Sequence, residues 1–436
     1  MKGVSMGSLR TAVAGSCSAL LALGLMAVSA PAAHAEPCDS GPLGSGSGSG
    51  LPGSGSGTGS FGTGSAGPRL GSSGSGSGGL APEGPQGPLP ALGPGPTSTV
   101  SWVTGPRSPN RTFDRFSISG TDLGIMWDNG EEGDDRQILM AFGDTFGDCS
   151  LPDQQWRHNV LMRTTDADLS DGIDVPDPVP GDRRAGSPVL PSAPDISREL
   201  VGSLALDGVE ITVIPTAGIA VDGVQYVNFM SVRSWGDHGE WWTNASMIAT
   251  SADNGETWQL DPTTARINLP LDVPTVQQLS TGNENFQQHA YVRHEGYVYD
   301  FGTPQGRFGA AFVSRVPETA LLDLAAYEYW SGDDWVSGDA AAATPVVPPA
   351  VGEMSVQFLG GEFVMLYGNE ANGTIEMRTS ARPEGPWSEA RVLVTHREIG
   401  GLYAPFIHPW STDTDLYFTA SRWGDYNVLL LRTTLS

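Results

Sequence analysis

Two aspartates stand in glycine-flanked motifs whose residue types suit acid–base chemistry. Asp122 lies in Gly-Thr-Asp-Leu-Gly at residues 120–124, and Asp144 lies in Phe-Gly-Asp-Thr-Phe-Gly at residues 142–147. Glycine beside a strand end lets the backbone turn sharply and leaves the neighbouring carboxylate unobstructed. Glycosidic bond cleavage needs two such groups, one to protonate the leaving oxygen and one to activate water or attack carbon. Both residues would serve equally well in Asx turns that end strands.

The elements that must position these aspartates recur five times after Thr99. The copies read VLMRTT (160–165), SMIATS (246–251), AAFVSRV (310–316), IEMRTS (375–380) and VLLLRTT (428–434). Each copy follows an aromatic-rich strand such as ILMAFGDTF or YVYDFGTP. A two-strand unit that recurs at long period without a helical repeat is typical of a β-propeller. We therefore predict an all-β, five-bladed β-propeller.

The repeats place the five blades near residues 100–175, 200–270, 285–340, 350–395 and 400–436. The last blade lacks an outer strand, so we expect the early strand around Val100 to Val103 to complete it. Such closure leaves no long sheet edge exposed. Helical periodicity is almost absent, and only residues 321–330 suggest a short helix or turn.

Residues 251–258 match the hairpin signature called the Asp-box, with the sequence Ser-Ala-Asp-Asn-Gly-Glu-Thr-Trp. In this motif Gly255 permits a positive φ, Asp253 accepts backbone N–H bonds and Trp258 packs on the hairpin. Sialidases carry the motif, but the sequence shows no arginine cluster with an accompanying inner-strand motif. The Asp-box therefore predicts the fold rather than an activity, and we expect Asp253 to be structural.

The first 98 residues are divided by composition. Residues 1–35 begin with basic residues, continue with an apolar stretch and end in small residues. This pattern predicts a signal peptide and therefore a secreted, extracellular or envelope-associated protein. The apolar stretch is too short for a membrane span. Residues 36–98 are rich in Gly, Ser and Pro, a composition that predicts a disordered linker. Residues 99–436 form the expected propeller domain.

Export would leave Cys38 and Cys149 in a compartment where disulfides persist, but the sequence alone leaves their pairing open.

The formal charge of -26 disfavours nucleic acid and anionic membranes as partners. Neutral polymers remain suitable partners. The twelve tryptophans suit stacking on sugars, although most Trp residues in an all-β protein pack between sheets.

Metal-binding patterns are weak. The acidic stretch from Asp128 to Asp135 lacks the ligand pattern of an EF-hand loop, so we expect a solvated hairpin tip. The sequence contains no zinc pattern, P-loop or dinucleotide fingerprint. We expect no cofactor, while a calcium ion on the propeller axis stays open because its ligands would come from separate blades.

Several motifs resemble an actinobacterial family long labelled a domain of unknown function. They are the TDLG and GDTF motifs, GTPQGRFG (302–309), SRV (314–316), YEYW (327–330) and WGDYNV (423–428). Members of that family are associated with endo-D-arabinanase activity on mycobacterial-type envelope arabinan. The resemblance implies a five-bladed propeller and an inverting glycoside hydrolase whose paired aspartates correspond to Asp122 and Asp144. On this reading we favour Asp144 as the base and Asp122 as the acid.

Further polar residues are candidates for substrate binding. Asn283, Glu284 and Asn285 form a polar turn before the third blade, and Glu284 is also a reserve acid. Arg307 could bind furanose hydroxyls, or it could form an ion pair with a carboxylate and so stabilise the blade. Tyr403 and Glu353 are weaker candidates, and His289 and His408 are more simply read as packed or surface residues.

Together these observations predict a secreted enzyme that cleaves internal α-D-arabinofuranosyl linkages of arabinogalactan or lipoarabinomannan. We expect a monomer whose nucleophile is water. Two alternatives stay open: a non-catalytic propeller that binds envelope glycan, and an exo-acting arabinofuranosidase. The first would lack a carboxylate pair in its site, and the second would need a closed pocket.

Overall fold

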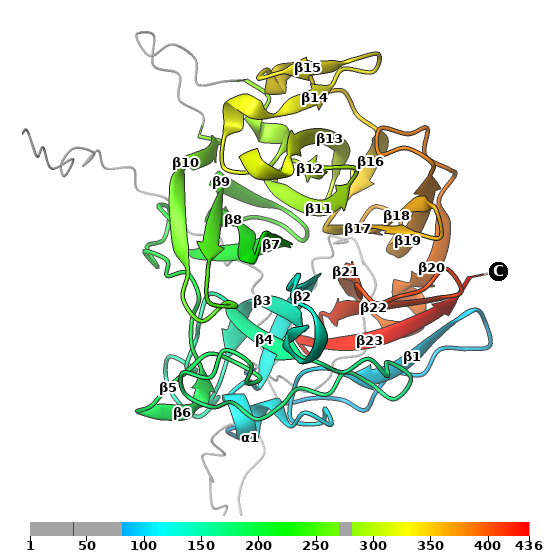
Figure 1. Cartoon of the computed structure of the whole chain (residues 1–436). Coiled ribbons are helices and arrows are strands. Elements are labelled where there is room, and N and C mark those ends of the chain that lie inside the picture. Colours follow the sequence, from blue (N-terminus) through cyan, green and yellow to red (C-terminus); the bar gives the residue numbers. More distant parts are fainter. Residues whose placement is uncertain (1–37, 39–80, 270–280, 436) are drawn as a thin grey trace, which may run out of the picture. The chain divides into compact units, whose positions relative to one another are not determined.

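Five antiparallel sheets follow one another along the chain and are arranged around a common axis (Figure 1). The structure, a computed structural model, describes Cys38, residues 81–269 and residues 281–435. From the axis outwards, blade one contains β2 (Gly120–Asp128), β3 (Ile138–Phe146) and β4 (Val160–Thr164). Blade two contains β7 (Thr212–Val221), β8 (Val224–Trp235), β9 (Trp241–Ser251) and β10 (Gln259–Ile267).

The other three blades complete the ring. Blade three contains β11 (Gln288–His294), β12 (Tyr297–Thr303), β13 (Gly309–Pro317), β14 (Glu328–Trp330), β15 (Trp335–Ser337) and β16 (Val347–Val351), which pairs with β13. Blade four contains β17 (Met354–Leu359), β18 (Glu362–Asn369), β19 (Thr374–Ser380) and β20 (Arg391–Thr395). Blade five contains β21 (Leu402–Ile407), β22 (Asp415–Arg422), β23 (Asn427–Thr434) and β1 (Thr97–Trp102).

The remaining elements are short and lie between strands of the blades. They are the β5 (Val189–Leu190) and β6 (Ala193–Ser197) pair, the helices α1 (Thr112–Phe116) and α2 (His396–Ile399), and the 3-10 turns η1 (Gly133–Asp135), η2 (Asn283–Asn285), η3 (Glu318–Ala320), η4 (Leu324–Ala326) and η5 (Ala340–Ala342). Residues 321–330, where a short helix or turn was expected, contain η4 and then β14. No helix among the described residues is long and apolar enough to cross a membrane.

The first strand of the ring closes the last blade. Strand β1 pairs antiparallel with β23, with Trp102 opposite Leu429. The five innermost strands also contact one another in a closed cycle, in the order β2, β7, β11, β17, β21 and back to β2. The predicted five-bladed all-β fold and its closure by the early strand are both confirmed.

The middle strands of the blades are apolar because both of their faces are covered. In β3 the run from Ile138 to Phe142 is fully buried, as is the run from Val428 to Leu431 in β23. One apolar cluster joins Leu139 of blade one, Val227 of blade two and Val428 of blade five. Packing between neighbouring sheets therefore holds the ring together.

Residues 81–98 fall inside the segment expected to be a disordered linker, yet the structure places them against the propeller. Pro82 accepts a hydrogen bond from the Cys149 amide, at 2.9 Å. The buried Gln86 side chain donates to the Thr104 carbonyl and accepts from the Arg107 amide. These partners come from residues far along the chain, so composition could not reveal them. Residues 1–37 and 39–80, which include the expected signal peptide, lie outside the described residues.

The pairing of the two cysteines, which the sequence left open, is a disulfide in the structure. Cys38 and Cys149 are bonded, with their Cα atoms 5.3 Å apart and a sequence separation of 111. Both residues are buried. The bridge ties Cys38 to the loop that follows β3.

The Asp-box has the structural role predicted for it. It forms the turn between β9 and β10, where Asp253 accepts hydrogen bonds from the Thr257 amide and from the hydroxyls of Ser251 and Thr257. The Trp258 indole donates to the Gly255 carbonyl, at 3.1 Å, and Gly255 has a φ of 84°. No side chain of this motif lines the pocket described below.

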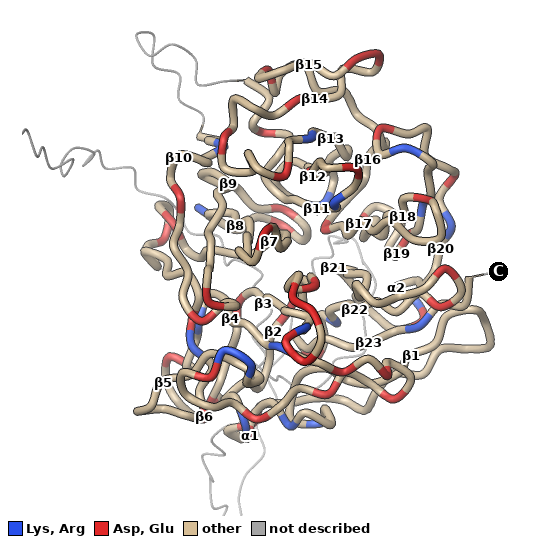
Figure 2. The backbone as a smooth tube through the Cα atoms, viewed as in Figure 1, with Lys and Arg blue, Asp and Glu red and all other residues tan. Residues whose placement is uncertain are grey.

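The acidic stretch at 128–135 forms the exposed turn between β2 and β3, as expected for a solvated hairpin tip. Asp128 pairs with Arg136 at 2.7 Å, and Asp135 contacts Arg184. Elsewhere Asp and Glu residues are spread over all five blades (Figure 2). The negative net charge is therefore a property of the whole ring rather than of one tail.

Candidate active site

One end of the ring collects the groups that form the site. Because neighbouring strands in a blade alternate in direction, the starts of the innermost strands lie at the same end as the turns between second and third strands. Asp122, Thr212, Gln288 and Tyr403 stand at the starts of innermost strands. The turns from β8 to β9, β12 to β13, β18 to β19 and β22 to β23 surround them.

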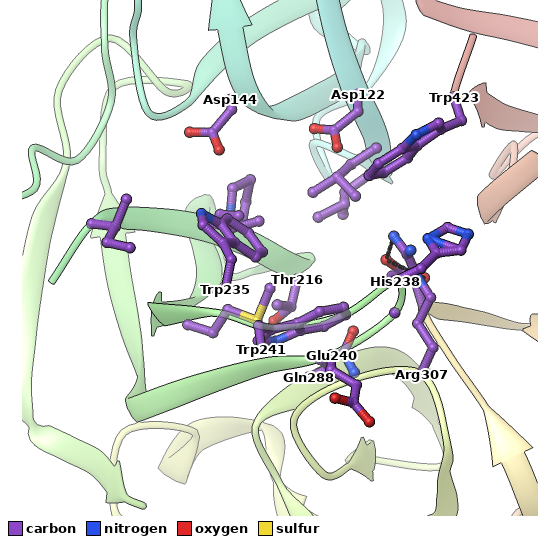
Figure 3. A pocket seen from close by; sticks show the side chains of 18 of the residues that line it. Asp122, Asp144, Thr216, Trp235, His238, Glu240, Trp241, Gln288, Arg307 and Trp423 are labelled. Carbon is purple, nitrogen blue, oxygen red and sulfur yellow. Dashed lines mark hydrogen bonds and ion pairs between the residues drawn. The ribbon is translucent and has the colours of Figure 1, made fainter. Parts of the chain in front are cut away.

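Asp122 and Asp144 face a common pocket of about 300 Å³ at this end (Figure 3). Its walls come from all five blades, and both aspartates are partly exposed to it. Aromatic side chains contribute much of the lining: Phe146, Trp156, Trp235, Trp241, Phe406, Trp423 and Tyr426. A concave, largely apolar site with a few convergent polar groups is the usual form of a small-molecule or sugar site.

An irregular part of the β2–β3 pairing brings the two aspartates together. Thr121 lies opposite Thr145 and Leu123 lies opposite Phe142, so Asp122 alone faces the two residues Gly143 and Asp144. This is a β-bulge, a feature that bends a strand and changes the direction of its side chains. Asp144 stands near the end of β3, the second strand of blade one, whereas Asp122 stands near the start of the innermost strand β2.

Gly143 is needed for this arrangement because the Asp122 carboxyl group lies directly over it. A Cβ atom at residue 143 would come 2.5 Å from Asp122 Oδ1 and 3.1 Å from Leu123 Cδ1. No heavier residue fits there while Asp122 keeps its position. The glycine that precedes Asp144 in the sequence thus shapes the site through Asp122.

Asp144 is surrounded by hydrogen-bond donors. Its Oδ1 accepts from the Thr212 hydroxyl at 2.7 Å and from the Trp156 indole at 3.0 Å. Burial raises the pKa of Asp144 to about 6, and the two hydrogen bonds limit that rise because they favour the ionised form. Asp144 is consequently mainly ionised at pH 7.

Asp122 has a poorer hydrogen-bond environment. Its Oδ2 accepts from the Tyr403 hydroxyl at 2.9 Å, and its Oδ1 is buried with no hydrogen bond of normal geometry. Burial and then the nearby charge of Asp144 raise the pKa of Asp122 to about 8. Tyr403 and Arg307 act against this rise without cancelling it. Asp122 therefore retains its proton at pH 7.

Arg307 and Glu353 form an ion pair on the wall of the pocket. Arg307 Nε and Nη2 both donate to Glu353, with distances of 2.7 to 3.0 Å. The guanidinium also lies over the Tyr403 ring, 4.6 Å from its centroid. Burial alone would lower the pKa of Arg307, but Glu353 raises it above its ordinary value. The sequence left Arg307 between sugar binding and a carboxylate pair, and the structure shows the pair.

The other residues proposed from the sequence are divided by the structure. Tyr403 is buried and hydrogen-bonded to Asp122, while Glu353 lines the pocket. Asn283, Glu284 and Asn285 form η2 and are not among the residues that line the pocket; Glu284 is exposed and accepts from the Gly282 amide.

The two histidines noted in the sequence are both packed residues. His289 lines the pocket but bonds to Asp300 at 2.7 Å and to Ser246. His408 is buried, and burial lowers its pKa to about 3. The structure gives neither imidazole a place beside the two aspartates.

Sequence reasoning missed Thr212, Trp156, Tyr426 and the turn from β8 to β9. Thr212 and Trp156 bond to Asp144 from positions 68 and 12 residues away. Tyr426 is buried beside both aspartates, and burial together with their charges raises its pKa well above its ordinary value. Tyr426 follows Trp423 in the WGDYNV motif, which was the one available signal. No pattern in a single sequence could have identified the other residues.

Among the described residues, no group of three or more His, Cys, Asp or Glu side chains is placed to hold a metal ion.

The fold and the site together define a five-bladed propeller with two unlike aspartates in one pocket. By sequence, the chain belongs to the family described as a domain of unknown function (DUF4185), which matches residues 107–432. This agrees with the family resemblance seen in the motifs.

Two relatives illustrate the spread of this similarity. Notoamide biosynthesis cluster protein J from Aspergillus sp. (strain MF297-2) is 30% identical over 326 residues, covering 71% of this chain and 81% of that protein. An uncharacterized 35.9 kDa protein in the asd 3' region of Mycolicibacterium smegmatis is 28% identical over 145 residues, 30% of this chain and 43% of that protein.

Similar solved structures are more distant in sequence. A putative hydrolase from Bacteroides ovatus ATCC 8483 has a TM-score of 0.48 at 16% identity, covering 74% of this chain and 88% of that one. A GH43_1 enzyme from Xanthomonas citri has a TM-score of 0.40 at 12% identity, covering 73% and 88%.

Proposed function

We propose that this protein is a secreted glycoside hydrolase that cleaves internal α-D-arabinofuranosyl linkages of arabinogalactan or lipoarabinomannan. The observation that carries the proposal is a pair of carboxyl groups in one pocket with unlike surroundings, since Asp144 accepts two hydrogen bonds and Asp122 accepts one. Pairs of titratable groups whose surroundings separate their pKa values provide an acid and a base at the same pH. The arabinan substrate and the export rest on the sequence motifs, and the aromatic lining of the pocket suits a sugar.

In the proposed reaction Asp144 is the base and Asp122 is the acid. A water molecule transfers a proton to Asp144 while its oxygen forms a bond to the anomeric carbon. The bond from that carbon to the leaving oxygen breaks, and the oxygen keeps the electron pair and takes the proton of Asp122. Asp144 then returns its proton to solvent and Asp122 regains one. Direct attack by water inverts the anomeric configuration.

The experiment that tests this function is incubation of the purified protein with mycobacterial arabinogalactan, followed by sizing of the products. Short arabino-oligosaccharides, formed first as β-anomers in NMR spectra, support the proposal. Single sugars would indicate an exo-acting enzyme. Polymer that binds but stays intact would indicate a glycan-binding propeller and overturn the enzymatic proposal.

The proposed roles predict a bell-shaped pH profile of kcat/KM. Turnover needs Asp144 ionised and Asp122 protonated, so the limbs should lie near pH 6 and pH 8. Thr212→Val removes a bond that lowers the pKa of Asp144, and only the acidic limb should move to higher pH. Tyr403→Phe removes a bond that lowers the pKa of Asp122, and only the alkaline limb should move, also to higher pH. Identical profiles for all three proteins would contradict the assignment.

Gly143→Ala should lower kcat/KM by up to about a hundredfold, because its Cβ displaces the Asp122 carboxyl group. The Asp122 side chain can rotate away, so thermal unfolding should change little. Gly368→Ala in β18 is the matched control, since a Cβ there meets nothing within 4 Å. Equal kinetics for the two variants would show that the contact with Gly143 does not position Asp122.

A further inference from the structure

The turn between β8 and β9 crosses from blade two towards blades four and five at the mouth of the pocket. Its residues 235–241 all line the pocket. His238 Nε2 lies 3.1 Å from Glu370 Oε1 in the turn between β18 and β19. The same imidazole lies 5.3 Å from the Trp423 indole, between ring centroids, in the turn between β22 and β23. We call Trp423, His238 and Glu370 the rim.

The rim is held in place from several sides. Arg307 donates its amide hydrogen to the Gly239 carbonyl at 2.9 Å, which fixes the crossing turn to blade three. Gly239 has a φ of 80°, a conformation that glycine adopts without strain. Trp423 packs edge-to-face on Tyr403, with ring centroids 5.4 Å apart. A pre-formed surface of this kind loses little freedom when a ligand binds.

The rim lies on the side of the pocket that holds the acid. Tyr403, which contacts Trp423, donates its hydroxyl to Asp122. In the view of Figure 3, Trp423 and His238 lie on the Asp122 side of the pocket, and Asp144 lies farther from both. In the proposed reaction the leaving oxygen must approach Asp122. The sugar attached to that oxygen is therefore directed towards the rim.

The side chains of the rim suit a sugar. An indole face packs on the C–H face of a furanose or pyranose ring, and its neighbours can bind the hydroxyls at the ring edge. The His238 side chain is 57% exposed, so its imidazole is accessible from the pocket mouth. The imidazole has a second ring nitrogen for a sugar hydroxyl, while the Glu370 side chain, only 11% exposed and outside the pocket lining, holds the imidazole through their 3.1 Å contact.

From this geometry we propose that Trp423 and His238, with His238 positioned by Glu370, form a binding subsite for the sugar on the leaving-group side of the cleaved bond. The inference rests on the proposed function, because the direction of the substrate follows from Asp122 as the acid. It adds a contact with the sugar that leaves, which a substrate with a small non-sugar leaving group would not make.

The test measures binding separately from turnover. Linear α-D-arabinofuranosyl oligosaccharides are titrated by calorimetry into Asp144→Asn protein, with and without His238→Ala or Trp423→Leu. We expect each added change to raise Kd about tenfold, which corresponds to the loss of one modest contact. In otherwise wild-type protein, the same two changes should shift cleavage of the oligosaccharides to other linkages. Trp410→Leu is the matched control, because Trp410 lies outside the pocket of the two aspartates and should change neither result.

The outcomes separate this inference from the proposed function. If wild-type protein cleaves arabinan but the rim variants keep its Kd and its cleavage pattern, the subsite is wrong and the enzymatic function stands. A lower melting temperature with unchanged Kd would mean that the rim only joins the blades, which also overturns the subsite. If wild-type protein does not cleave arabinan, the proposed function fails, and the absence of oligosaccharide binding would then remove the subsite as well.

Discussion

Asp144→Asn lowers kcat/KM on arabinan by about 10²- to 10⁴-fold, and Asp122→Asn does the same, because each removes one partner of the acid–base pair. The two variants should differ with an aryl arabinofuranoside whose leaving group needs no protonation. On that substrate Asp122→Asn recovers much of its activity, since the acid is no longer required. Asp144→Asn stays inactive, since activation of water is still required. The reverse pattern would exchange the two roles.

The stability of these variants provides the control. The folded state raises the pKa of Asp122 from 3.8 to about 8, so the folded protein holds a proton that the unfolded chain releases. The contribution of Asp122 to wild-type stability must therefore fall as pH rises from about 4 to about 8. Asparagine never ionises, so Asp122→Asn should unfold at a higher temperature than wild type at pH 8. At pH 4 the two should unfold at similar temperatures. Unfolding of Asp122→Asn at lower temperature throughout would mean that lost activity reflects lost structure.

Arg307→Met should lower the free energy of unfolding by about 3–5 kcal/mol, the second large effect expected here. The side chains of Arg307 and Glu353 are only 8% and 12% exposed, and the substitution leaves Glu353 without its cation. The double variant Arg307→Met with Glu353→Leu should recover much of the loss, because no buried charge is then unpaired. Denaturant unfolding monitored by tryptophan fluorescence measures all three proteins.

A second ion pair in blade three is the matched control. Arg315 and Glu328 are bonded at 2.8 Å, but their side chains are 23% and 28% exposed. Arg315→Met should therefore cost only about 0–1 kcal/mol. If Arg307→Met costs no more than Arg315→Met, the pocket pair does not stabilise the fold. Arg307 also lowers the pKa of Asp122, so Arg307→Met should move the alkaline limb of the pH profile upwards.

The propeller fold could be predicted because the same two-strand sequence pattern recurs in every blade. The apolar copies such as 160–165 and 428–434 became the third strands of their blades, buried between neighbouring sheets. The missing outer strand of blade five pointed to β1, which pairs with β23. The linker was misjudged over residues 81–98, because local composition does not record the partners that Pro82 and Gln86 find elsewhere.

The site was only partly predictable. The neighbouring glycines in the sequence identified Asp122 and Asp144 as candidates, and both side chains line the same pocket. Their difference in protonation depends on Thr212, Trp156 and Tyr403, which reach them from separate strands and loops. The polar turn at 283–285 resembled a binding loop in sequence, but the ring places it outside the pocket lining. Which polar residues converge is decided by the closure of the ring, and a linear pattern does not contain that information.

The proposed reaction requires that one aspartate of the pair keeps its proton at neutral pH while the other does not. The most direct measurement is an NMR titration of the ¹³C-labelled aspartate carboxyl groups, with Asp122→Asn and Asp144→Asn proteins to assign the two signals. We predict midpoints near pH 8 for Asp122 and near pH 6 for Asp144. Midpoints below pH 5 for both residues would leave the pocket without an acid at neutral pH and would contradict the account.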